Sequence, residues 1–333
     1  MKAWQIVKEG IDALQLAETA PRDPGHGELR VRVEASSINY RDLMTVKHGA
    51  ARGVPLPRIP NSDGAGVVTA VGAGVAGIAV GDRVVSCFFQ DWTDGACSPE
   101  AMASALGGAV DGVLAEEVVL KADGVVPVPA HLSTAEAATL PCAALTAWHA
   151  LVEVGRLKAG DTVLLLGTGG VSIFALQFAT AMGARVILTS SSDAKLERAR
   201  AMGAAETVNY KAQPDWQKAV LELTGGRGVD VTVEVGGPGT LARSVEATRV
   251  AGRIAMIGVL TGGSIDPTTI MRKSITLQGV YVGSRRMFLE MNRALALHAI
   301  RPVIDRTVPF AEAKDAYRAM EAAGHFGKIV IAG

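Results

Sequence analysis

The sequence contains few cysteines, few aromatic residues and no excess of either charge. Its 333 residues include three cysteines, and Phe, Trp and Tyr make up 5% of the chain. Cys87, Cys97 and Cys142 are widely spaced and form no C-x-x-C pair, so we expect a reducing, cytoplasmic compartment rather than a disulfide framework. With 33 basic and 33 acidic residues the net charge is zero. We therefore expect neither nucleic acid nor an anionic membrane as a partner.

Long apolar runs are missing as well. No uninterrupted apolar stretch reaches the roughly 20 residues that a membrane-spanning helix needs. The first residues, MKAWQIVKEG, lack the apolar core of a signal peptide and are typical of a strand. Hydrophobic residues nevertheless make up 49% of the chain and charged residues 20%, which favours a large core over disorder. The composition is that of a soluble cytoplasmic α/β enzyme with two domains.

The sequence does have a glycine-rich stretch between an expected strand and an expected helix. The run Thr162–Leu166 is wholly apolar apart from its first residue and is typical of a strand buried on both faces, and apolar residues then recur at helical spacing up to Met182. Glycines between the two let the backbone approach a pyrophosphate, whose charge is attracted by the N–H groups at the helix start. In the pattern G-x-G-x-x-G the third glycine is replaced by Ser172, which is small enough to keep the helix close to the strand. The residues expected at the pyrophosphate are Gly167, Gly169, Gly170 and Val171.

The first part of the chain differs from the middle in the secondary structure that its residue pattern predicts. Residues 1–130 show short strands separated by Pro, Gly and Asp clusters, which predicts a β domain with few helices. The long connection 90–112 is either a mobile lobe or a lid over a site. From residue 131 onwards helices and strands alternate, as in a doubly wound parallel sheet. The predicted strands are 2–7, 28–37, 66–71, 82–89, 114–119, 162–166, 185–190, 206–209, 229–235, 253–259, 275–282 and 328–332, and the predicted helices include one from 134 that is kinked or divided at Pro141, 193–202, 214–223, 240–250, 286–298 and 311–323.

These stretches together resemble the medium-chain dehydrogenase/reductases over nearly the whole chain. The matching strings are INYRDL at 38–43, PNSDGAGVVTAVGAGV at 60–75, GDRVV at 81–85, ATLPCAALTAW at 138–148, GTGGVS at 167–172 and GKIVI at 327–331. The resemblance implies a GroES-like β domain formed by both chain ends, 1–130 and 283–333, and a Rossmann domain, 131–282, with the active site between them. It also implies hydride transfer between a nicotinamide cofactor and a small molecule, and a homodimer formed through the outer strand 275–282.

The resemblance also bears on zinc. Zinc-dependent members hold a catalytic ion with a Cys, a His beside a Glu, and a second Cys, and the corresponding positions here are Asn39, Ser62-Asp63 and Cys142. Amides and hydroxyls are poor zinc ligands and one thiolate does not replace three ligands. The lobe that binds a structural zinc in some members would lie within 90–112, where Cys97 stands alone. We therefore expect no metal, and we interpret Cys142 as a packing residue rather than a ligand.

Without zinc, hydrogen-bond donors must meet the negative charge that develops on the substrate oxygen. The candidates at the family's active-site positions are Asn39, Tyr40, Arg41 and Ser62. Asn39 is preferred because an amide donates without titrating. Arg41 is alternatively a surface residue or a contact of the cofactor phosphates, and Asp42 either orients the site or caps the following turn.

Three aromatic residues are candidates for the substrate pocket. Phe88 matches an aromatic that lines the family's pocket, and Phe89 and Trp92 follow it in the sequence; the alternative is core packing. The segment after INYRDL lacks the tyrosine that quinone and enoyl reductases often carry. That absence counts against both of these activities and leaves the substrate open. An enone or quinone reduced by NADPH is the first expectation, and an alcohol/aldehyde pair the second.

Charge favours NADP(H) over NAD(H). NAD-binding folds usually place an Asp or Glu about 20 residues after the glycines, whereas this chain has Ser190 there, followed by Ser191 and Lys195, which suit a 2′-phosphate. Asp193 is the complication, although as the expected helix N-cap it has other donors to satisfy. The resemblance further implies cofactor contacts by Thr146, by Tyr210 (or a half-buried strand-end tyrosine), by Gly258, Val259, Val280 and Val282, and by Lys328, which reaches either the pyrophosphate or solvent.

The sequence thus predicts an α/β protein with a GroES-like and a Rossmann domain. The expected function is zinc-independent hydride transfer between NADP(H) and a small carbonyl compound, an enone or quinone first. The alternatives are an alcohol/aldehyde dehydrogenase of the same superfamily and a non-catalytic NADP(H)-binding sensor.

Overall fold

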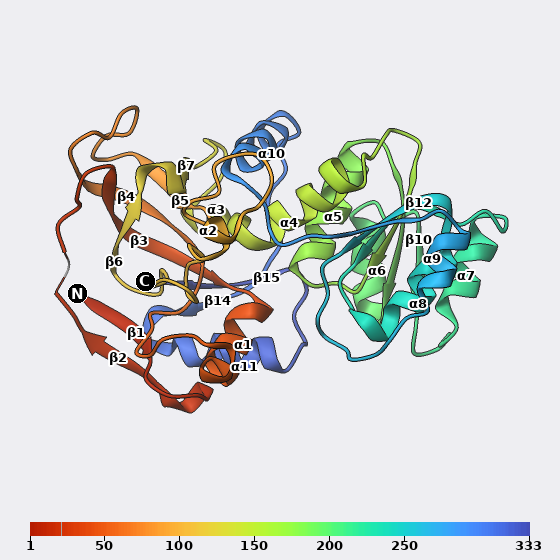
Figure 1. The fold of residues 1–333 in the computed structure, drawn as a ribbon, viewed down its shortest axis with the longest axis horizontal. Helices are drawn as coiled ribbons and strands as arrows, with labels where there is room; N and C mark the ends of the chain where they lie inside the picture. Colours follow the sequence, from red (N-terminus) through yellow and green to blue (C-terminus); the bar gives the residue numbers. More distant parts are fainter. Residues whose placement is uncertain (21) are drawn as a thin grey trace. The chain divides into compact units, whose positions relative to one another are not determined.

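The computed structural model describes residues 1–20 and 22–333 and divides into two compact units (Figure 1). The first unit contains Met1–Leu145 and Val282–Gly333, and the second contains Thr146–Tyr281. Residues 131–145, which the sequence analysis assigned to the second domain, belong to the first unit. The reason is local, because the helical turn at Thr134–Ala137 contacts two strands of the first unit's sheet.

The first unit is built on a mixed, largely antiparallel sheet with the strand order β14-β15-β3-β4-β5-β7, in which β6 also pairs with β3 (Figure 1). A separate antiparallel pair, β1-β2, completes its strands. The strands are β1 (Lys2–Ile6), β2 (Leu14–Glu18), β3 (Glu28–Ile38), β4 (Asp63–Val71), β5 (Arg83–Ser86), β6 (Glu117–Lys121), β7 (Val125–Pro127), β14 (Ile304–Pro309) and β15 (Lys328–Ala332). The helices are α1 (Tyr40–His48), α2 (Pro99–Met102), α3 (Thr134–Ala137), α10 (Arg285–Leu297) and α11 (Ala313–Glu321), with shorter turns at Ile11–Ala13, Ala50–Arg52, Ala122–Gly124 and Phe310–Glu312.

One face of α11 closes the core beneath β3 and β15. Its buried residues, Ala313, Ala316, Tyr317 and Met320, recur at the spacing of a helix that is apolar on one side. They join a core cluster with residues of β3 and β15, namely Ile38, Ile329 and Ile331. The last helix and the last strand therefore fix the end of β3, where the candidate active site begins.

The second unit is a parallel sheet with the order β10-β9-β8-β11-β12-β13, which is the arrangement of a dinucleotide-binding fold. The strands are β8 (Thr162–Leu166), β9 (Arg185–Ser190), β10 (Glu206–Asn209), β11 (Val229–Glu234), β12 (Thr248–Met256) and β13 (Thr276–Gly279). The helices are α5 (Gly170–Ala181), α6 (Asp193–Ala201), α7 (Trp216–Leu223), α8 (Pro238–Ala247) and α9 (Pro267–Arg272). Every strand pair is parallel, so the predicted fold class, GroES-like plus Rossmann, is confirmed.

The helical segment predicted from residue 134 is present in several pieces. After α3 the chain winds as a π-helix at Leu140–Ala144, as α4 at Leu145–Trp148, and again as a π-helix at His149–Val154. Pro141 lies at the start of the first π-helical piece. Its missing N–H and its ring disfavour continuous α-helical hydrogen bonding through this point.

Several predicted elements have other bounds in the structure; for example, the strand predicted at 82–89 ends at Ser86 and the strand predicted at 253–259 ends at Met256. The helix predicted at 240–250 stops at Ala247, because the Thr248 hydroxyl donates to the carbonyl of Ser244 and the chain continues as β12. The strand predicted at 275–282 is shortened to β13, the last strand of its sheet. The homodimer expectation rests on this edge and stays a prediction. Helix α1 was not predicted at all.

The connection 90–112 is anchored to the first unit. The Trp92 carbonyl accepts from the N–H of Arg285 in α10 at 2.9 Å, and the N–H of Gly112 donates to Ile59 at 2.7 Å. Next to it, the N–H of Val113 donates to the Asn61 carbonyl at 2.9 Å. The end of this connection therefore packs against the backbone at residues 59–61. Among residues 1–20 and 22–333, none of the helices combines the length and apolar character required to span a bilayer.

We predict that Gly112→Ala destabilises the protein. A Cβ at Gly112 would lie 2.1 Å from the Asn61 carbonyl oxygen and 2.2 Å from that of Pro60, and backbone atoms have no room to move away. The free energy of unfolding should fall by about 2 kcal/mol or more, measured by denaturant unfolding. Gly324→Ala is the matched control, since a Cβ there meets no atom within 4 Å. Equal stability of the two variants would contradict the packing described above.

Candidate active site

A buried polar cluster lies where β3 ends and where α1, β4 and β15 begin. The pairing of β15 with β3 sets Ile329 opposite Ile38, and the pairing of β3 with β4 sets Ser37 opposite Asp63. This pairing brings Lys328, the first residue of β15, close to Ile38 at the end of β3 and to Asp63 at the start of β4. Asn39 follows β3 directly and is the N-cap residue of α1.

The Asp63 carboxylate is the acceptor at the centre of this cluster. Its Oδ1 accepts from the Ser62 hydroxyl at 2.6 Å, and its Oδ2 accepts from the Ser37 hydroxyl at 3.2 Å and from the backbone N–H of Cys142 at 3.3 Å. Lys328 Nζ lies 3.6 Å from the same Oδ2. The side chain of Asp63 is fully buried, so the ammonium and the three donors replace the water that a carboxylate would otherwise bind.

Lys328 is buried, with 3% of its side chain exposed. Its ammonium donates to the Ile38 carbonyl at 3.0 Å and to Oδ1 of Asn39. The sequence analysis assigned Lys328 to the pyrophosphate or to solvent, and the structure corrects this assignment. Register explains the difference, because the first residue of β15 lies against the buried end of β3.

The Asn39 amide is held on one side only. Its Oδ1 accepts from Lys328, and its backbone N–H donates to Oδ2 of Asp42 at 2.9 Å. Its Nδ2 is buried and has no hydrogen-bond partner among the described residues. A buried donor left unpaired costs about 1–3 kcal/mol, so this nitrogen is the position in the cluster that a ligand oxygen would satisfy.

Arg41 and Asp42 form a second buried pair at the start of α1. Arg41 Nη1 donates to Oδ1 of Asp42 at 3.1 Å and to the Leu106 carbonyl at 2.6 Å, and its guanidinium lies 4.6 Å from the centre of the Phe88 ring. Burial raises the pKa of the Asp42 carboxyl, and the neighbouring Arg41 charge opposes that rise. Asp42 therefore caps α1, and Arg41 joins α1 to the connection 90–112. Tyr40, in contrast, is exposed.

The three pocket candidates pack against one another. Phe88 and Phe89 meet edge to face with ring centres 4.7 Å apart, and Phe89 and Trp92 do so at 5.7 Å. All three are at least 95% buried. Their observed role within the first unit is packing, and Phe88 is linked to the polar cluster through Arg41.

A second network supports the residue before Ser62. Asn61 has a φ of 66°, in the left-handed region, and is fully buried. Its Nδ2 donates to the Ser36 hydroxyl at 3.0 Å, and its Oδ1 accepts from the hydroxyl of the buried Tyr317. Burial raises the pKa of Tyr317 well above its usual value. These bonds hold an unfavourable backbone conformation in place and so fix the direction of Ser62.

The residues at the zinc-ligand positions do not fit a zinc ion. Asn39 Oδ1 already accepts from an ammonium group, which also lies beside Asp63. Burial raises the pKa of the Cys142 thiol, and the Asp63 charge adds to the rise. Cys142 is also the one sulfur among these positions, and one thiolate does not replace a set of three ligands. Across the described chain, no three His, Cys, Asp or Glu side chains gather as a metal site.

The glycine turn of the second unit is open on the side that a phosphate would occupy. Gly167 has a φ of 74°, and a Cβ placed on Gly167 or Gly169 would meet no atom within 4 Å. Gly169 is the N-cap of α5 and has no side chain to accept from the first N–H groups of the helix. Those donors are thereby left for an anion. Gly170 and Val171 begin the helix, so all four predicted residues lie together at this turn.

Ser172 explains why the third glycine can be replaced. Its hydroxyl donates to the Leu166 carbonyl at 2.7 Å, back towards the strand. The side chain is therefore turned away from the open side of the turn, and it ties α5 to the end of β8. A serine here preserves the close approach of helix and strand that the glycine provides elsewhere.

The residues at the end of β9 lie next to this turn. The N–H of Gly167 donates to the Thr189 carbonyl at 2.8 Å, and Ser190 follows as the buried last residue of β9. The N-cap of α6 is Ser192, which corrects the prediction that Asp193 has that role. Asp193 instead accepts from Nδ2 of Asn209 at 2.7 Å. Ser191 and Lys195 are half-buried, and Tyr210 is 40% exposed.

A buried glutamate that the sequence analysis missed shapes the neighbouring loops. Glu234 ends β11 and accepts from the N–H groups of Gly236 and Gly237 at 2.7 and 3.0 Å, and from the hydroxyls of Thr240 and Ser244. Its own carbonyl accepts from the N–H of Gly258 at 2.9 Å. An acidic residue ending an apolar strand, followed by two glycines, was the available signal.

The remaining predicted cofactor residues are distributed over both units. Gly258 approaches Val235 so closely that a Cβ would lie 2.2 Å from the Val235 carbonyl carbon, and Val259 beside it is 75% exposed. Thr146, Val280 and Val282 are buried. Val282 belongs to the first unit and the other two to the second.

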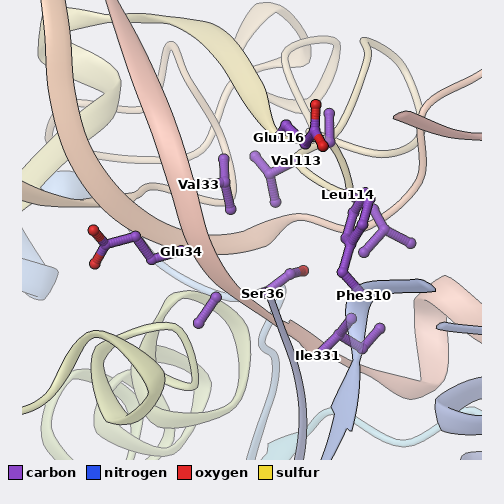
Figure 2. Close-up of a pocket in the computed structure, with 11 residues that line it drawn as sticks. Val33, Glu34, Ser36, Val113, Leu114, Glu116, Phe310 and Ile331 are labelled. Carbon is purple, nitrogen blue, oxygen red and sulfur yellow. The ribbon is translucent and has the colours of Figure 1, made fainter. Parts of the chain in front are cut away.

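A cavity of about 110 Å³ lies in the first unit (Figure 2). The cavity is lined by residues of β3, of the segment 113–116, of the turn Phe310–Glu312 and of the C-terminal end of the chain. Those labelled in Figure 2 are Val33, Glu34, Ser36, Val113, Leu114, Glu116, Phe310 and Ile331. None of the predicted site residues lines it. Ser36 connects it to the network of Asn61, so the cavity lies behind the polar cluster.

Comparison with known proteins agrees with this arrangement. Residues 25–130 match the alcohol dehydrogenase GroES-like domain, and residues 170–297 match the zinc-binding dehydrogenase domain. A zinc-type alcohol dehydrogenase-like protein of Schizosaccharomyces pombe is 42% identical over 331 residues, 97% of this chain and 96% of the relative. The crystal structure of a Sinorhizobium meliloti 1021 protein, also 42% identical, covers 100% of this chain and 98% of its own with a TM-score of 0.92. The chain therefore belongs to the medium-chain dehydrogenase/reductase superfamily and is an oxidoreductase of this type.

Other relatives differ in the cofactors and acceptors that their names state. An NAD-dependent alcohol dehydrogenase of known structure is 35% identical with a TM-score of 0.91, and both chains are fully covered. Two mycobacterial structures, one in complex with NADPH and one of a quinone oxidoreductase, are each 29% identical with TM-scores of 0.84 and 0.82 and full coverage of both chains. A 2-haloacrylate reductase from Burkholderia is 29% identical and covers 97% of this chain and 96% of its own. The relatives whose names state a cofactor all bind a nicotinamide dinucleotide, but some of these names state NAD and others NADP(H).

We predict that one of the three thiols is reactive in the folded protein. Cys97 is exposed, whereas burial raises the pKa of Cys87 to about 12 and that of Cys142 as well. Since only the thiolate reacts, about one Cys87 in ten thousand is reactive at pH 8. Titration with an aromatic disulfide reagent at pH 8 should give one fast thiol per chain, and three after unfolding in guanidinium. A fast thiol that persists in Cys97→Ser would contradict the raised pKa of the buried Cys87 and the half-buried Cys142.

Proposed function

We propose that this protein is a zinc-independent reductase that transfers a hydride from NADPH to a small conjugated carbonyl compound, an enone or a quinone. The observation that carries the proposal is the ammonium group of Lys328 inside the set of residues at the zinc-ligand positions. It donates to Asn39 and lies 3.6 Å from Asp63. A divalent cation placed among the same residues would be repelled by this charge and would find its oxygen ligands already engaged.

The residues present are suited to stabilise charge on a substrate oxygen. When bound, the reduced nicotinamide supplies the hydride. As the hydride reaches the β-carbon of an enone, the electron pair of the C=C bond moves towards the carbonyl oxygen, and a proton from solvent completes the reduction. The unpaired Nδ2–H of Asn39 is the donor offered to that oxygen. Ser62 is engaged with Asp63 and supports the cluster rather than the substrate.

The second unit supports first a dinucleotide and then its phosphorylated form. Its glycine turn is open and its first helical N–H groups have no capping side chain, which suits the pyrophosphate of either cofactor. The end of β9 carries Ser190 where NAD-binding folds have a carboxylate, and the nearest acid, Asp193, is engaged by Asn209. The NADPH complex among the relatives agrees with this choice, whereas the NAD-dependent relative favours the other cofactor.

Two alternatives remain as outcomes of the tests. An alcohol/aldehyde dehydrogenase is supported by the names of several relatives. A non-catalytic NADP(H)-binding sensor would use the glycine turn alone.

We predict that the purified protein consumes NADPH with an enone or a quinone and keeps this activity after chelation. Without a metal in the site, treatment with EDTA should change kcat by less than about twofold. The assay follows NADPH absorbance with a panel of quinones, enones and aldehydes, beside metal analysis of the same sample. About one zinc per chain with activity lost on chelation would refute the metal-free reductase. Tight NADPH binding without turnover of any acceptor would identify the sensor, and turnover of aldehydes alone the dehydrogenase.

We predict that Ser190→Asp reverses the cofactor preference. A carboxylate at the end of β9 repels a 2′-phosphate but accepts hydrogen bonds from a 2′-hydroxyl. kcat/KM for NADPH should fall by about tenfold or more while that for NADH does not fall. The control is Ser98→Asp, which adds the same charge at the N-cap of α2 in the first unit. Wild-type protein that uses NADH and NADPH equally well would refute the assignment of NADP(H).

A further inference from the structure

Lys328 is held in one position by both chain ends of the first unit. Its backbone N–H donates to the Val303 carbonyl at 2.9 Å, and the preceding Gly327 has a φ of 82°. A Cβ on Gly327 would lie 2.4 Å from the Val303 carbonyl oxygen. The backbone from which this lysine projects is thus fixed on both sides.

The ammonium determines which way the Asn39 amide faces. An amide turned by 180° would point its NH₂ group at the ammonium, donor against donor, so Oδ1 must face Lys328 and Nδ2 must face away. This Nδ2 is the buried donor that has no partner among the described residues.

The ammonium group is already engaged inside the cluster. It donates to the Ile38 carbonyl and to Oδ1 of Asn39, and it forms an ion pair with the Asp63 carboxylate at 3.6 Å. With 3% of its side chain exposed, Lys328 is enclosed by these three residues rather than open to a substrate. Its charge reaches a substrate only through the Asn39 amide, whose N–H bonds it polarises by binding the amide oxygen.

We infer that Lys328 is a positioning residue, which orients and polarises Asn39 so that its Nδ2–H meets the substrate oxygen that gains negative charge. The inference rests on the proposed function for its catalytic consequence. The orientation of the amide itself does not depend on turnover. Lys328 thus supplies a positive charge at the position of the metal ion in the metal-dependent members. Unlike a metal ion it does not bind the substrate oxygen itself, because it acts through the Asn39 amide.

The kinetic test is a double-mutant cycle between positions 328 and 39. Lys328→Met leaves the buried Asp63 without its counter-charge, so the combined variant Lys328→Met/Asp63→Asn is made alongside it to keep a folded protein. Either variant should lower kcat with the enone or quinone by about tenfold or more while the KM for NADPH stays within about twofold. In an Asn39→Ala background the same changes should lower kcat by less than about threefold further, because the residues act in series. Lys8→Met, at an exposed lysine of the same unit, is the control and should keep wild-type kcat.

The second test does not need turnover. In protein labelled with ¹⁵N-asparagine, the side-chain amide signal of Asn39 is identified by its loss in Asn39→Ala. It should move in Lys328→Met/Asp63→Asn by more than it moves in Lys8→Met. An unmoved signal, unchanged kcat in the Lys328 variants, or effects at 328 and 39 that multiply would each overturn the positioning role. If wild-type protein turns over no acceptor, the proposed function fails, and the amide signal alone decides the role of Lys328.

Discussion

The candidate active site depends on the buried ion pair between Lys328 and Asp63. The exposed fractions of the two side chains are 3% and 0%. Such a pair contributes little net stability, because desolvation offsets most of the attraction, yet removing one partner alone costs about 3–5 kcal/mol. Here the remaining lone pairs of Asp63 are filled by Ser62, Ser37 and the N–H of Cys142. The cluster is therefore satisfied as a whole, apart from the one amide nitrogen of Asn39, and its members are coupled to one another.

Sheet topology creates this pair. Strand β3 has β15 on one side and β4 on the other, so residues around positions 38, 63 and 328 meet only when the last strand has joined the sheet. In the sequence, the whole second unit, Thr146–Tyr281, stands between β4, which carries Asp63, and β15, which carries Lys328. The first unit is thus closed by its own C-terminal residues, and the polar cluster forms together with that closure. This is why a lysine near the end of the chain reaches the residue that follows β3.

Features with a local signal were predictable from the sequence, and features set by distant pairing were not. The bounds of β8, β9 and β10 follow from their apolar runs and from nearby glycines, Gly167 after β8 and Gly183 and Gly203 before β9 and β10, and the structure has the same bounds. The turn at Gly167 was predictable for the same reason. Lys328 was not, since a lysine that begins an apolar strand carries no sign of whether its end of the strand is covered. Helix α1 was not predicted, since the residues that cap and begin it, Asn39 to Asp42, also stand at the family's active-site positions and gave no separate helix signal.

In each of the two units, the charge at a single position bears on what the unit can bind. At the end of β9 an uncharged serine stands where a carboxylate would select the 2′-hydroxyl, and in the polar cluster an ammonium stands where a metal would require ligands. A buried ammonium that donates to Ile38 and Asn39 and is paired with Asp63 offers no open coordination position, so it does not hold an alkoxide directly as a metal does. What it offers through Asn39 is a single polarised hydrogen bond. That is weak support for charge localised on one oxygen and adequate support for charge spread over a conjugated system, which is why we propose an enone or a quinone rather than a simple alcohol as the substrate.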